Sequence, residues 1–205
     1  TVSETVQEKL GFQCGRVFCD AYFNEEAKQD AASIIRQIID VYDNRLAHMD
    51  WMTESTRQEA RKKLRAITVK VGYPDEWPQD KYSLALKTPD EGGVYIDNIM
   101  DILKASQDYA FKTRHDPVDR EEWGMTPQTV NAYYNPGNNE IVFPAGILQA
   151  PFYDPEAAPV TNLGGIGAVI GHEITHAFDT SGSQYDEKGN LRDWWTAQDK
   201  QRFRE

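Results

Sequence analysis

The feature that most restricts the fold of this chain is a pair of histidines, four residues apart, near its C-terminal end. Residues 172–176 read His-Glu-Ile-Thr-His, inside a glycine-rich apolar segment that predicts a helix from about Leu163 to Asp179. On such a helix the Cβ atoms of His172 and His176 lie about 5–6 Å apart on one face. Both imidazoles then reach a single ion at about 2.0–2.1 Å, the usual Zn–N distance. The segment therefore predicts a helix that carries a zinc site.

Glu173 is rotated away from the face that carries the two histidines, so it is expected to stand beside the ion rather than on it. A carboxylate in that place takes a proton from a water that zinc activates and passes it to a leaving amine. The reaction class implied is metal-assisted hydrolysis of an amide. The alternative is a buried helix with two hydrogen-bonded histidines and an accidental glutamate.

Asp179 lies three residues after His176, on the same face of the predicted helix. It either binds the metal, or fixes the tautomer of a zinc-binding histidine through the free ring nitrogen, or faces water. The longer motif H-E-x-x-H-x-x-G-x-x-H is excluded, because Asp179 and Gly182 stand where it has glycine and histidine. A catalytic zinc site uses three protein ligands and water, and the third ligand is not visible.

The remaining histidines and the cysteines predict no further site. His48 and His115 are in distant segments and are expected at the surface. Cys14 and Cys19, five apart on a helix, point about 140° away from each other, so they cannot form a disulfide and are expected to be buried free thiols.

The rest of the chain predicts a mainly helical α+β fold. Helical periodicity and capping residues indicate four helices, Ser3–Phe23, Asn24–His48, Glu54–Ala66 with Thr53 as N-cap, and Asp97–Arg114, and an amphipathic pattern that begins near Thr196. Strand patterns cover Ile67–Gly72, Tyr82–Leu86, Thr129–Tyr134 and Glu140–Phe143, the last two joined as a hairpin. The solvated face of the third helix is predicted from Glu59, Arg61, Lys62 and Lys63. No linker divides the chain, so residues 1–205 are expected to form one partial domain, cut at both ends.

Charge and hydropathy exclude two classes of partner. The chain has 33 acidic and 22 basic residues and a net charge of −11, which argues against a nucleic-acid surface. No apolar run approaches the length of a membrane span. Gly164–Gly167 does not match the spacing of a dinucleotide-binding loop, and its glycines are expected to permit close packing beside the histidine helix.

Asn131-Ala132-Tyr133-Tyr134 has two interpretations. It is either an ordinary aromatic strand of a hairpin or an edge strand whose free backbone groups pair with an extended peptide. In the second interpretation the Asn131 amide also grips the peptide backbone.

Three segments together resemble the neprilysin/endothelin-converting-enzyme family of zinc metallopeptidases. They are Val130–Asn135, Glu140–Leu148 and Gly164–His176, followed by Phe178-Asp179 and Gly189–Trp195. Upstream, Leu10-Gly11, Ala21–Phe23 and Trp51-Met52 continue the likeness in the same order and spacing. The fold that the resemblance implies is the thermolysin-like catalytic half, mainly helical, with a small sheet beside the zinc helix.

The resemblance also implies roles for single residues and one Zn²⁺ ion in the intact protein. His172 and His176 match the first two zinc ligands, Glu173 the catalytic base, and Asp179 an aspartate that supports a zinc-binding histidine. Residues that match peptide-binding positions are Asn131 and Ala132 for the substrate backbone, and Ile147, Phe152 and Val169 for a hydrophobic pocket after the scissile bond.

Several parts of the family pattern are not found in this sequence. The family's third ligand, a later glutamate, lies beyond the 29 residues that follow His176, as do a histidine and an arginine that bind substrate. We therefore expect that the intact protein is a zinc endopeptidase that cleaves oligopeptides. These 205 residues alone are expected to be inactive or nearly so. Because the sequence shows no anchor, glycosylation site or disulfide, we expect a bacterial-type relative. The resemblance implies an extracytoplasmic or secreted location. The alternatives are a non-catalytic peptide-binding fragment that uses the Asn131–Ala132 strand, and a purely structural helical domain.

Overall fold

A computed structural model describes residues 2–78 and 84–204 of the chain, which cluster into two compact units. The smaller unit combines the described residues up to Cys14 with those from Pro74 to Glu122. The larger unit combines Gly15–Tyr73 with the described residues from Trp123 onward, and it contains every candidate site residue.

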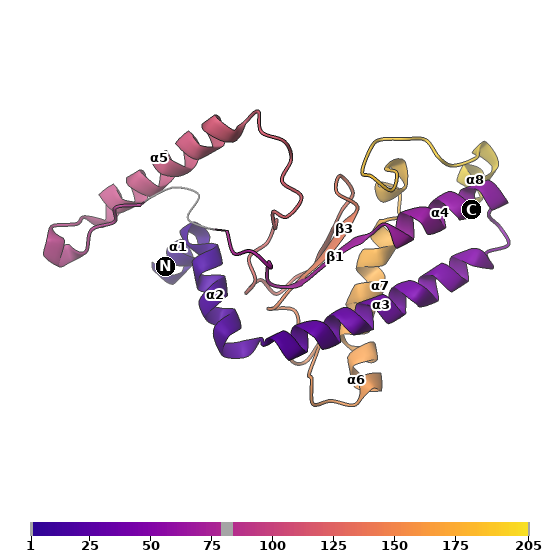
Figure 1. Ribbon diagram of the computed structural model, residues 1–205, viewed down its shortest axis with the longest axis horizontal. Coiled ribbons are helices and arrows are strands. Elements are labelled where there is room, and N and C mark those ends of the chain that lie inside the picture. Colours follow the sequence, from indigo (N-terminus) through magenta and orange to yellow (C-terminus); the bar gives the residue numbers. More distant parts are fainter. Residues whose placement is uncertain (1, 79–83, 205) are drawn as a thin grey trace. The chain divides into compact units, whose positions relative to one another are not determined.

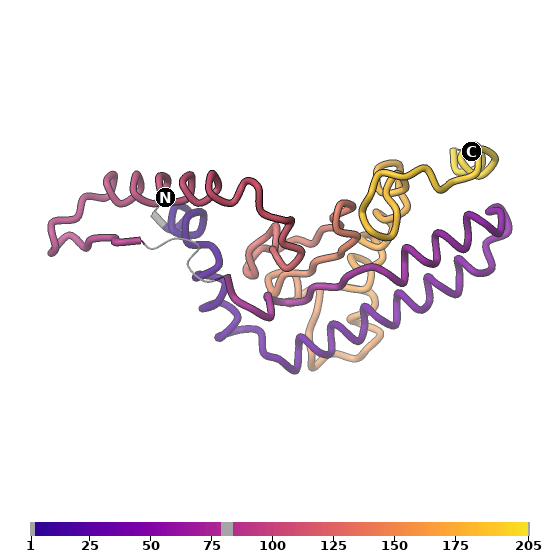
Figure 2. Tube along the Cα trace, turned by 45° about the horizontal axis from the view of Figure 1, so that its top comes forward, coloured from indigo at the N-terminus to yellow at the C-terminus, as the bar shows by residue number. Residues whose placement is uncertain are grey.

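The larger unit is built mainly from helices. It holds most of α2 (Gly11–Tyr22) and then α3 (Glu25–Ala47), α4 (Glu54–Arg65), α6 (Pro159–Gly164), α7 (Ile166–His176) and α8 (Ala197–Arg202). The long helices α3 and α4 pack side by side (Figures 1 and 2). Asn24 begins α3 as predicted, since its side chain accepts a hydrogen bond from the Ala27 N–H at 2.9 Å.

A three-stranded sheet with the order β1-β3-β2 lies in the same unit. The strands are β1 (Thr68–Gly72), β2 (Tyr133–Asn135) and β3 (Glu140–Pro144). The central strand β3 runs parallel to β1 and antiparallel to β2, and all five of its residues are buried. The turn between β2 and β3 contains Asn139, which has a φ of +50°, in the left-handed region that asparagine tolerates.

Helix α7 packs against α3, α6 and β2 (Figure 1). Its buried stripe consists of Ile166, Ile170 and Ile174, each at most 1% exposed and each four residues from the next, which places them on one face. The opposite face carries the histidines. The predicted mainly helical α+β fold, with a small sheet beside the histidine helix, is confirmed.

The predicted helix from Leu163 to Asp179 is wrong at both ends. Gly165 separates α6 from α7 with a non-helical ψ of −93°, and its Ile166 neighbour donates to the Phe152 carbonyl at 2.7 Å. A Cβ on Gly165 would lie 2.3 Å from the same carbonyl oxygen, so the expectation that glycine permits close packing holds at this position. Helix α7 ends at His176, and Asp179 lies in the loop beyond.

Two other predicted elements are also corrected. The helix expected over Ser3–Phe23 is two helices, α1 (Val2–Lys9) and α2, because Gly11 follows Leu10 and weakens the helix there. The strand expected over Thr129–Tyr134 begins only at Tyr133. The N–H of Ala132 bonds instead to the side chain of Asn131, at 2.9 Å, and such local bonds compete with sheet pairing.

Lys63 contradicts the prediction of a solvated face on α4, because it is only 1% exposed. The buried residues of α4 are Thr56, Ala60, Lys63 and Leu64. Their spacing is that of an inward helical stripe, and Lys63 belongs to it. Thr53 stands at the N-cap position of α4, but its hydroxyl makes no capping bond to the helix.

The smaller unit consists of α1, the start of α2 and α5 (Tyr95–Thr113), which matches the predicted Asp97–Arg114 helix to within two residues. A short 3₁₀ turn (Pro89–Glu91) precedes α5 and is closed by a capping box between Thr88 and Glu91. Tyr82 and Ser83 of the predicted strand lie outside the described residues, and residues 84–86 form no strand. Among the helices described, none combines the length and the apolar character that a membrane crossing requires.

Both cysteines are free thiols, as expected. Cys19 is buried, and burial raises the pKa of its thiol to about 11, so the thiol stays protonated and unreactive. Cys14 is partly exposed, so the prediction that it is buried is wrong. His48 and His115 are exposed, as predicted.

A single buried carboxylate joins the N-terminus of α4 to that of α8. Asp199, fully buried, accepts hydrogen bonds from the backbone N–H and hydroxyl of Thr53, at 3.0 and 2.5 Å, and from the hydroxyl of Thr196 at 2.7 Å. Burial raises the pKa of Asp199, but the hydrogen bonds from Thr53, Thr56 and Thr196 outweigh it and lower the pKa to about 2. The ionised carboxylate therefore stabilises the folded state.

We predict that Asp199→Asn lowers the free energy of unfolding by about 1–3 kcal/mol at neutral pH, because it removes charge-assisted hydrogen bonds. The contribution of Asp199 is complete above about pH 4 and is lost as the pH falls through the folded-state pKa of about 2. Wild type and variant should therefore converge in stability over that window. Urea unfolding followed by tryptophan fluorescence measures this, because Trp51 and Trp195 stack 6.3 Å apart beside α8. The exposed Asp193→Asn is the control, and an equal loss there would contradict the prediction.

Candidate metal centre

The two histidines of α7 converge on one point in space. The Nε2 atoms of His172 and His176 lie 3.0 Å apart, and their ring centroids are separated by 4.5 Å. Two ring nitrogens that bind one tetrahedral zinc at the usual distance are about 3.3 Å apart. His172 is exposed, and the side chain of His176 is 41% exposed, so an ion has access to both. The donor pair therefore fits zinc.

Asp179 fixes which nitrogen of His176 is available. Its Oδ2 atom lies 2.7 Å from Nδ1 of His176, which leaves Nε2 directed at His172. Its Oδ1 atom accepts hydrogen bonds from the N–H groups of Ser181 and Gly182, both at 2.8 Å. Burial raises the pKa of Asp179, but the bonds from Gly182, His176 and Ser181 outweigh it, and the pKa lies below its usual value. Asp179 thus orients an imidazole in the way carboxylates do behind metal ligands.

Glu173 is buried between α7 and the sheet, with 5% of its surface exposed. Burial raises the pKa of its carboxyl, while His172, His176 and a hydrogen bond from the Tyr134 N–H act to lower it. A raised carboxyl pKa suits a group that both accepts and donates a proton near neutral pH. Glu173 follows His172 by one residue and so lies about 100° further around the helix, which is why His172 is exposed while Glu173 is buried.

Within the described residues, no third side chain completes a metal-binding group of histidine, cysteine, aspartate or glutamate. A catalytic zinc site has three protein ligands. The described residues therefore bring together two candidate zinc donors, His172 and His176.

Helix α7 is fastened to α3 beside the histidines. The Tyr42 hydroxyl, on α3, donates to the Gly171 carbonyl at 3.0 Å and lies 3.1 Å from the Thr175 hydroxyl. Because Gly171 and Thr175 each adjoin a histidine in sequence, this contact fixes the rotation of α7 at the site. Tyr42 was not among the predicted site residues. The signal that marks it as inward-facing is its spacing of four residues from Ile38 and from Leu46 on α3.

Lys63 contacts the loop at the other end of α7. Its Nζ atom donates to the carbonyls of Ala177, Gly182 and Tyr185, at 2.8, 2.6 and 2.7 Å. Its predicted place on the solvated face of the helix is therefore wrong. The signal that marks it as buried is its position in the Thr56, Ala60 and Leu64 stripe of α4.

Gly182 is required by the same loop. A Cβ at Gly182 would lie 1.9 Å from the His176 carbonyl oxygen and 2.9 Å from the carbonyl carbon of Ala177. Any side chain there forces the loop away from the end of α7. This explains physically why the position that carries a histidine in the longer zinc motif carries glycine here.

The predicted peptide-binding residues are spread around α7 and β2. Asn131 is exposed and Ala132 is buried, and both precede the edge strand β2. The three predicted pocket residues differ in burial: Ile147 is 5% exposed, Phe152 is 38% exposed, and Val169 is half-buried. Their contact with a peptide stays a prediction.

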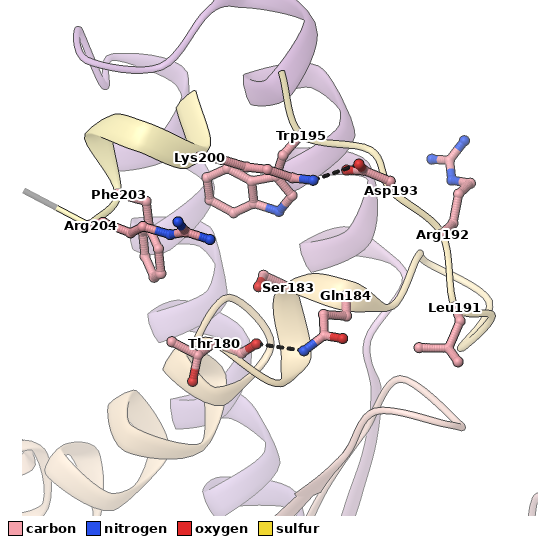
Figure 3. A pocket seen from close by; sticks show the side chains of 10 residues that line it. All are labelled: Thr180, Ser183, Gln184, Leu191, Arg192, Asp193, Trp195, Lys200, Phe203 and Arg204. Atoms are coloured by element: carbon pink, nitrogen blue, oxygen red, sulfur yellow. Dashed lines mark hydrogen bonds and ion pairs between the residues drawn. The ribbon is translucent and has the colours of Figure 1, made fainter. Parts of the chain in front are cut away.

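A cavity of about 570 Å³ opens beyond the loop that follows Asp179 (Figure 3). Its lining includes Thr180, Ser183, Trp195, Phe203 and Arg204, and neither histidine nor Glu173 takes part. Figure 3 shows Lys200 paired with Asp193 at its rim, at 2.5 Å. This cavity is therefore separate from the candidate metal centre.

Comparison with known families agrees with the geometry. Two models, both described as peptidase family M13, match residues 1–74 and residues 131–205. The chain belongs to peptidase family M13. This confirms the resemblance to the neprilysin/endothelin-converting-enzyme family.

Relatives within family M13 cover almost the whole chain. Human endothelin-converting enzyme 1 is 44% identical over 199 residues, which are 95% of this chain and 25% of the relative. The inhibitor complex of Mycobacterium tuberculosis zinc metalloprotease Zmp1 has a TM-score of 0.86 at 46% identity, over 97% of this chain and 29% of that one. PepO from Lactobacillus rhamnosis has a TM-score of 0.85 at 40% identity, over 97% of this chain and 31% of that one. The chain thus spans less than a third of the length of these M13 relatives.

We predict that Gly182→Ala weakens zinc binding by the full-length protein by about tenfold or more, because it displaces the loop that holds Asp179 against His176. The matched control is Gly164→Ala, since a Cβ at Gly164 meets nothing within 4 Å. Competition with a chromogenic chelator measures the zinc Kd of each variant. Equal zinc affinity in the two variants would show that the loop does not position the metal ligand.

Proposed function

We propose that this chain supplies two zinc ligands and the proton-transferring carboxylate of a zinc endopeptidase. The observation that carries the proposal is the convergence of the His172 and His176 Nε2 atoms, 3.0 Å apart, with the buried Glu173 between them in sequence. Membership of family M13 supports it. A zinc ion bound there supplies Lewis acidity toward the scissile carbonyl and the attacking water.

In the proposed mechanism Glu173 transfers the proton. Its carboxylate accepts a proton from the attacking water and then donates it to the amine of the departing peptide. The Tyr134 N–H holds the carboxylate in place from β2. Asp179 keeps His176 in the tautomer that presents Nε2, through its 2.7 Å contact with Nδ1.

The substrate would lie along the chain segment that leads into β2. The Ala132 N–H already bonds to the Asn131 side-chain oxygen, so the groups offered to a peptide are the Ala132 carbonyl and the Asn131 amide nitrogen. An extended peptide adds to such an edge by backbone hydrogen bonds. Ile147, Phe152 and Val169 would receive a hydrophobic side chain after the scissile bond.

We predict that Glu173→Gln lowers kcat for peptide hydrolysis by about 10²–10⁴-fold in the full-length protein, because amide nitrogen does not relay the proton. Zinc affinity should change little, since Glu173 is not proposed as a ligand. His172→Ala, in contrast, should lose zinc together with activity. The exposed Glu156→Gln serves as control. Full activity in Glu173→Gln, at equal zinc content, would refute the role of Glu173.

We also propose that the 205 residues alone hydrolyse peptides poorly or not at all, because two ligands hold zinc weakly. Calorimetric zinc titration of the isolated chain should show weak binding, and peptide cleavage should be absent. Tight one-to-one binding that is lost in His172→Ala would instead indicate a third ligand within the chain. If extended peptides bind equally well with and without a chelator, the alternative of a non-catalytic peptide-binding segment at Asn131–Ala132 is favoured.

A further inference from the structure

Lys63 carries a buried ammonium in the larger unit to which the proposed mechanism assigns no role. Lys63 is 1% exposed, and its Nζ atom donates to three backbone carbonyls, at 2.6 to 2.8 Å. Since an ammonium has three N–H donors, all of them are used. A charge buried at this depth costs free energy unless every donor is paired, and an apolar side chain of similar length would fill the same space at a lower cost.

The three carbonyls come from one short segment, the loop that follows α7. Ala177 is the C-cap residue of α7, Gly182 begins the next 3₁₀ turn, and Tyr185 ends it. The segment therefore bends around the ammonium, and carbonyls separated by eight residues of chain meet at one donor group.

The same loop carries Asp179, and Gly182 links it to Lys63. The Gly182 N–H donates to Oδ1 of Asp179 at 2.8 Å, and the Gly182 carbonyl accepts from Lys63 at 2.6 Å. Oδ2 of Asp179 in turn lies 2.7 Å from Nδ1 of His176. A continuous series of three hydrogen bonds thus runs from the α4 lysine to the imidazole.

We propose that Lys63 is a positioning residue for the metal centre: its ammonium holds the loop after α7 in the conformation in which Asp179 orients His176. The proposal rests on the proposed zinc site and adds a residue from a different helix to it. A lysine that only fills space or stabilises the fold would act on zinc binding independently of Asp179.

The charges around Lys63 are consistent with this role. Burial lowers the pKa of its amine to about 8, while the nearby carboxylates of Asp186 and Asp179 act to raise it. Tyr134 and Trp194 cover the ammonium, with ring centroids 5.8 and 5.9 Å from Nζ. The two carboxylates and the faces of the two rings favour the charged form of the amine.

The test is a double-mutant cycle on zinc affinity in the full-length protein, with Lys63→Met, Asp179→Asn and the double variant. Lys63→Met keeps most of the length of the side chain and removes its donors. We expect it to raise the zinc Kd by about tenfold or more, in the range typical of lost support behind a metal ligand. The double variant should bind zinc no more weakly than Asp179→Asn alone, because both changes break the same series of bonds.

A spectroscopic readout separates positioning from stability. The visible spectrum of the Co²⁺-substituted protein reports the geometry of the bound nitrogens, and it should change in Lys63→Met. The matched control is Lys62→Met, the neighbouring exposed lysine that pairs with Glu187 at 2.8 Å, and neither its zinc Kd nor its cobalt spectrum should change. Where Lys63→Met does not fold, Lys63→Gln retains two donors and is carried through the same cycle.

Two results would overturn the positioning role of Lys63. One is an unchanged zinc Kd in Lys63→Met, and the other is a loss of zinc affinity in the double variant equal to the product of the two single losses. Failure of the underlying zinc site gives a different result, in which the wild-type protein and His172→Ala bind zinc equally weakly. The two failures are therefore distinguishable.

Discussion

The candidate metal centre depends on the burial of one face of α7 against α3 and the sheet. Ile166, Ile170 and Ile174 are almost completely buried, and three such side chains contribute on the order of 5–9 kcal/mol relative to exposure. That is comparable with the net stability of a whole domain, about 5–15 kcal/mol. Helix α7 can therefore present two imidazoles to solvent and bury a carboxylate while it stays packed against α3 and the sheet.

Hydrophobic burial fixes where α7 lies, but polar contacts fix how it is turned and how it ends. Tyr42 bonds to the Gly171 carbonyl within the helix, and Lys63 bonds to the carbonyls of the loop that follows. The first contact lies one residue before His172, and the second lies one residue after His176. Because hydrogen bonds are directional, they restrict rotations that apolar packing alone tolerates.

The convergence of His172 and His176 could be predicted from sequence because its geometry is local. Four residues of helix place His176 over His172 wherever the helix lies, and the hairpin before it is likewise set by its Asn-Pro-Gly turn. The ends of α7 were less predictable because they depend on contacts with residues distant in sequence. The Ile166 N–H, next to Gly165, bonds to the Phe152 carbonyl, and the loop that carries Asp179 bonds to Lys63. Lys63 itself bonds to carbonyls that lie between 114 and 122 positions further along the chain. Its sequence neighbours Arg61 and Lys62 instead pair with the carboxylates of Asp43 and Glu187. The position of Lys63 in the helical stripe of Thr56, Ala60 and Leu64 indicates burial, whereas its charge favours solvent.

The contrast between His172 and Glu173 shows how the sheet takes part in the site. The two residues are adjacent in sequence, but His172 is exposed and Glu173 is only 5% exposed. The difference arises because a single helical step turns Glu173 toward β2. There the Tyr134 N–H bonds to its carboxylate. This N–H belongs to the edge strand, and its use by Glu173 removes it from pairing with any added strand. A strand added to this edge would therefore have to pair before Tyr134, along Asn131 and Ala132.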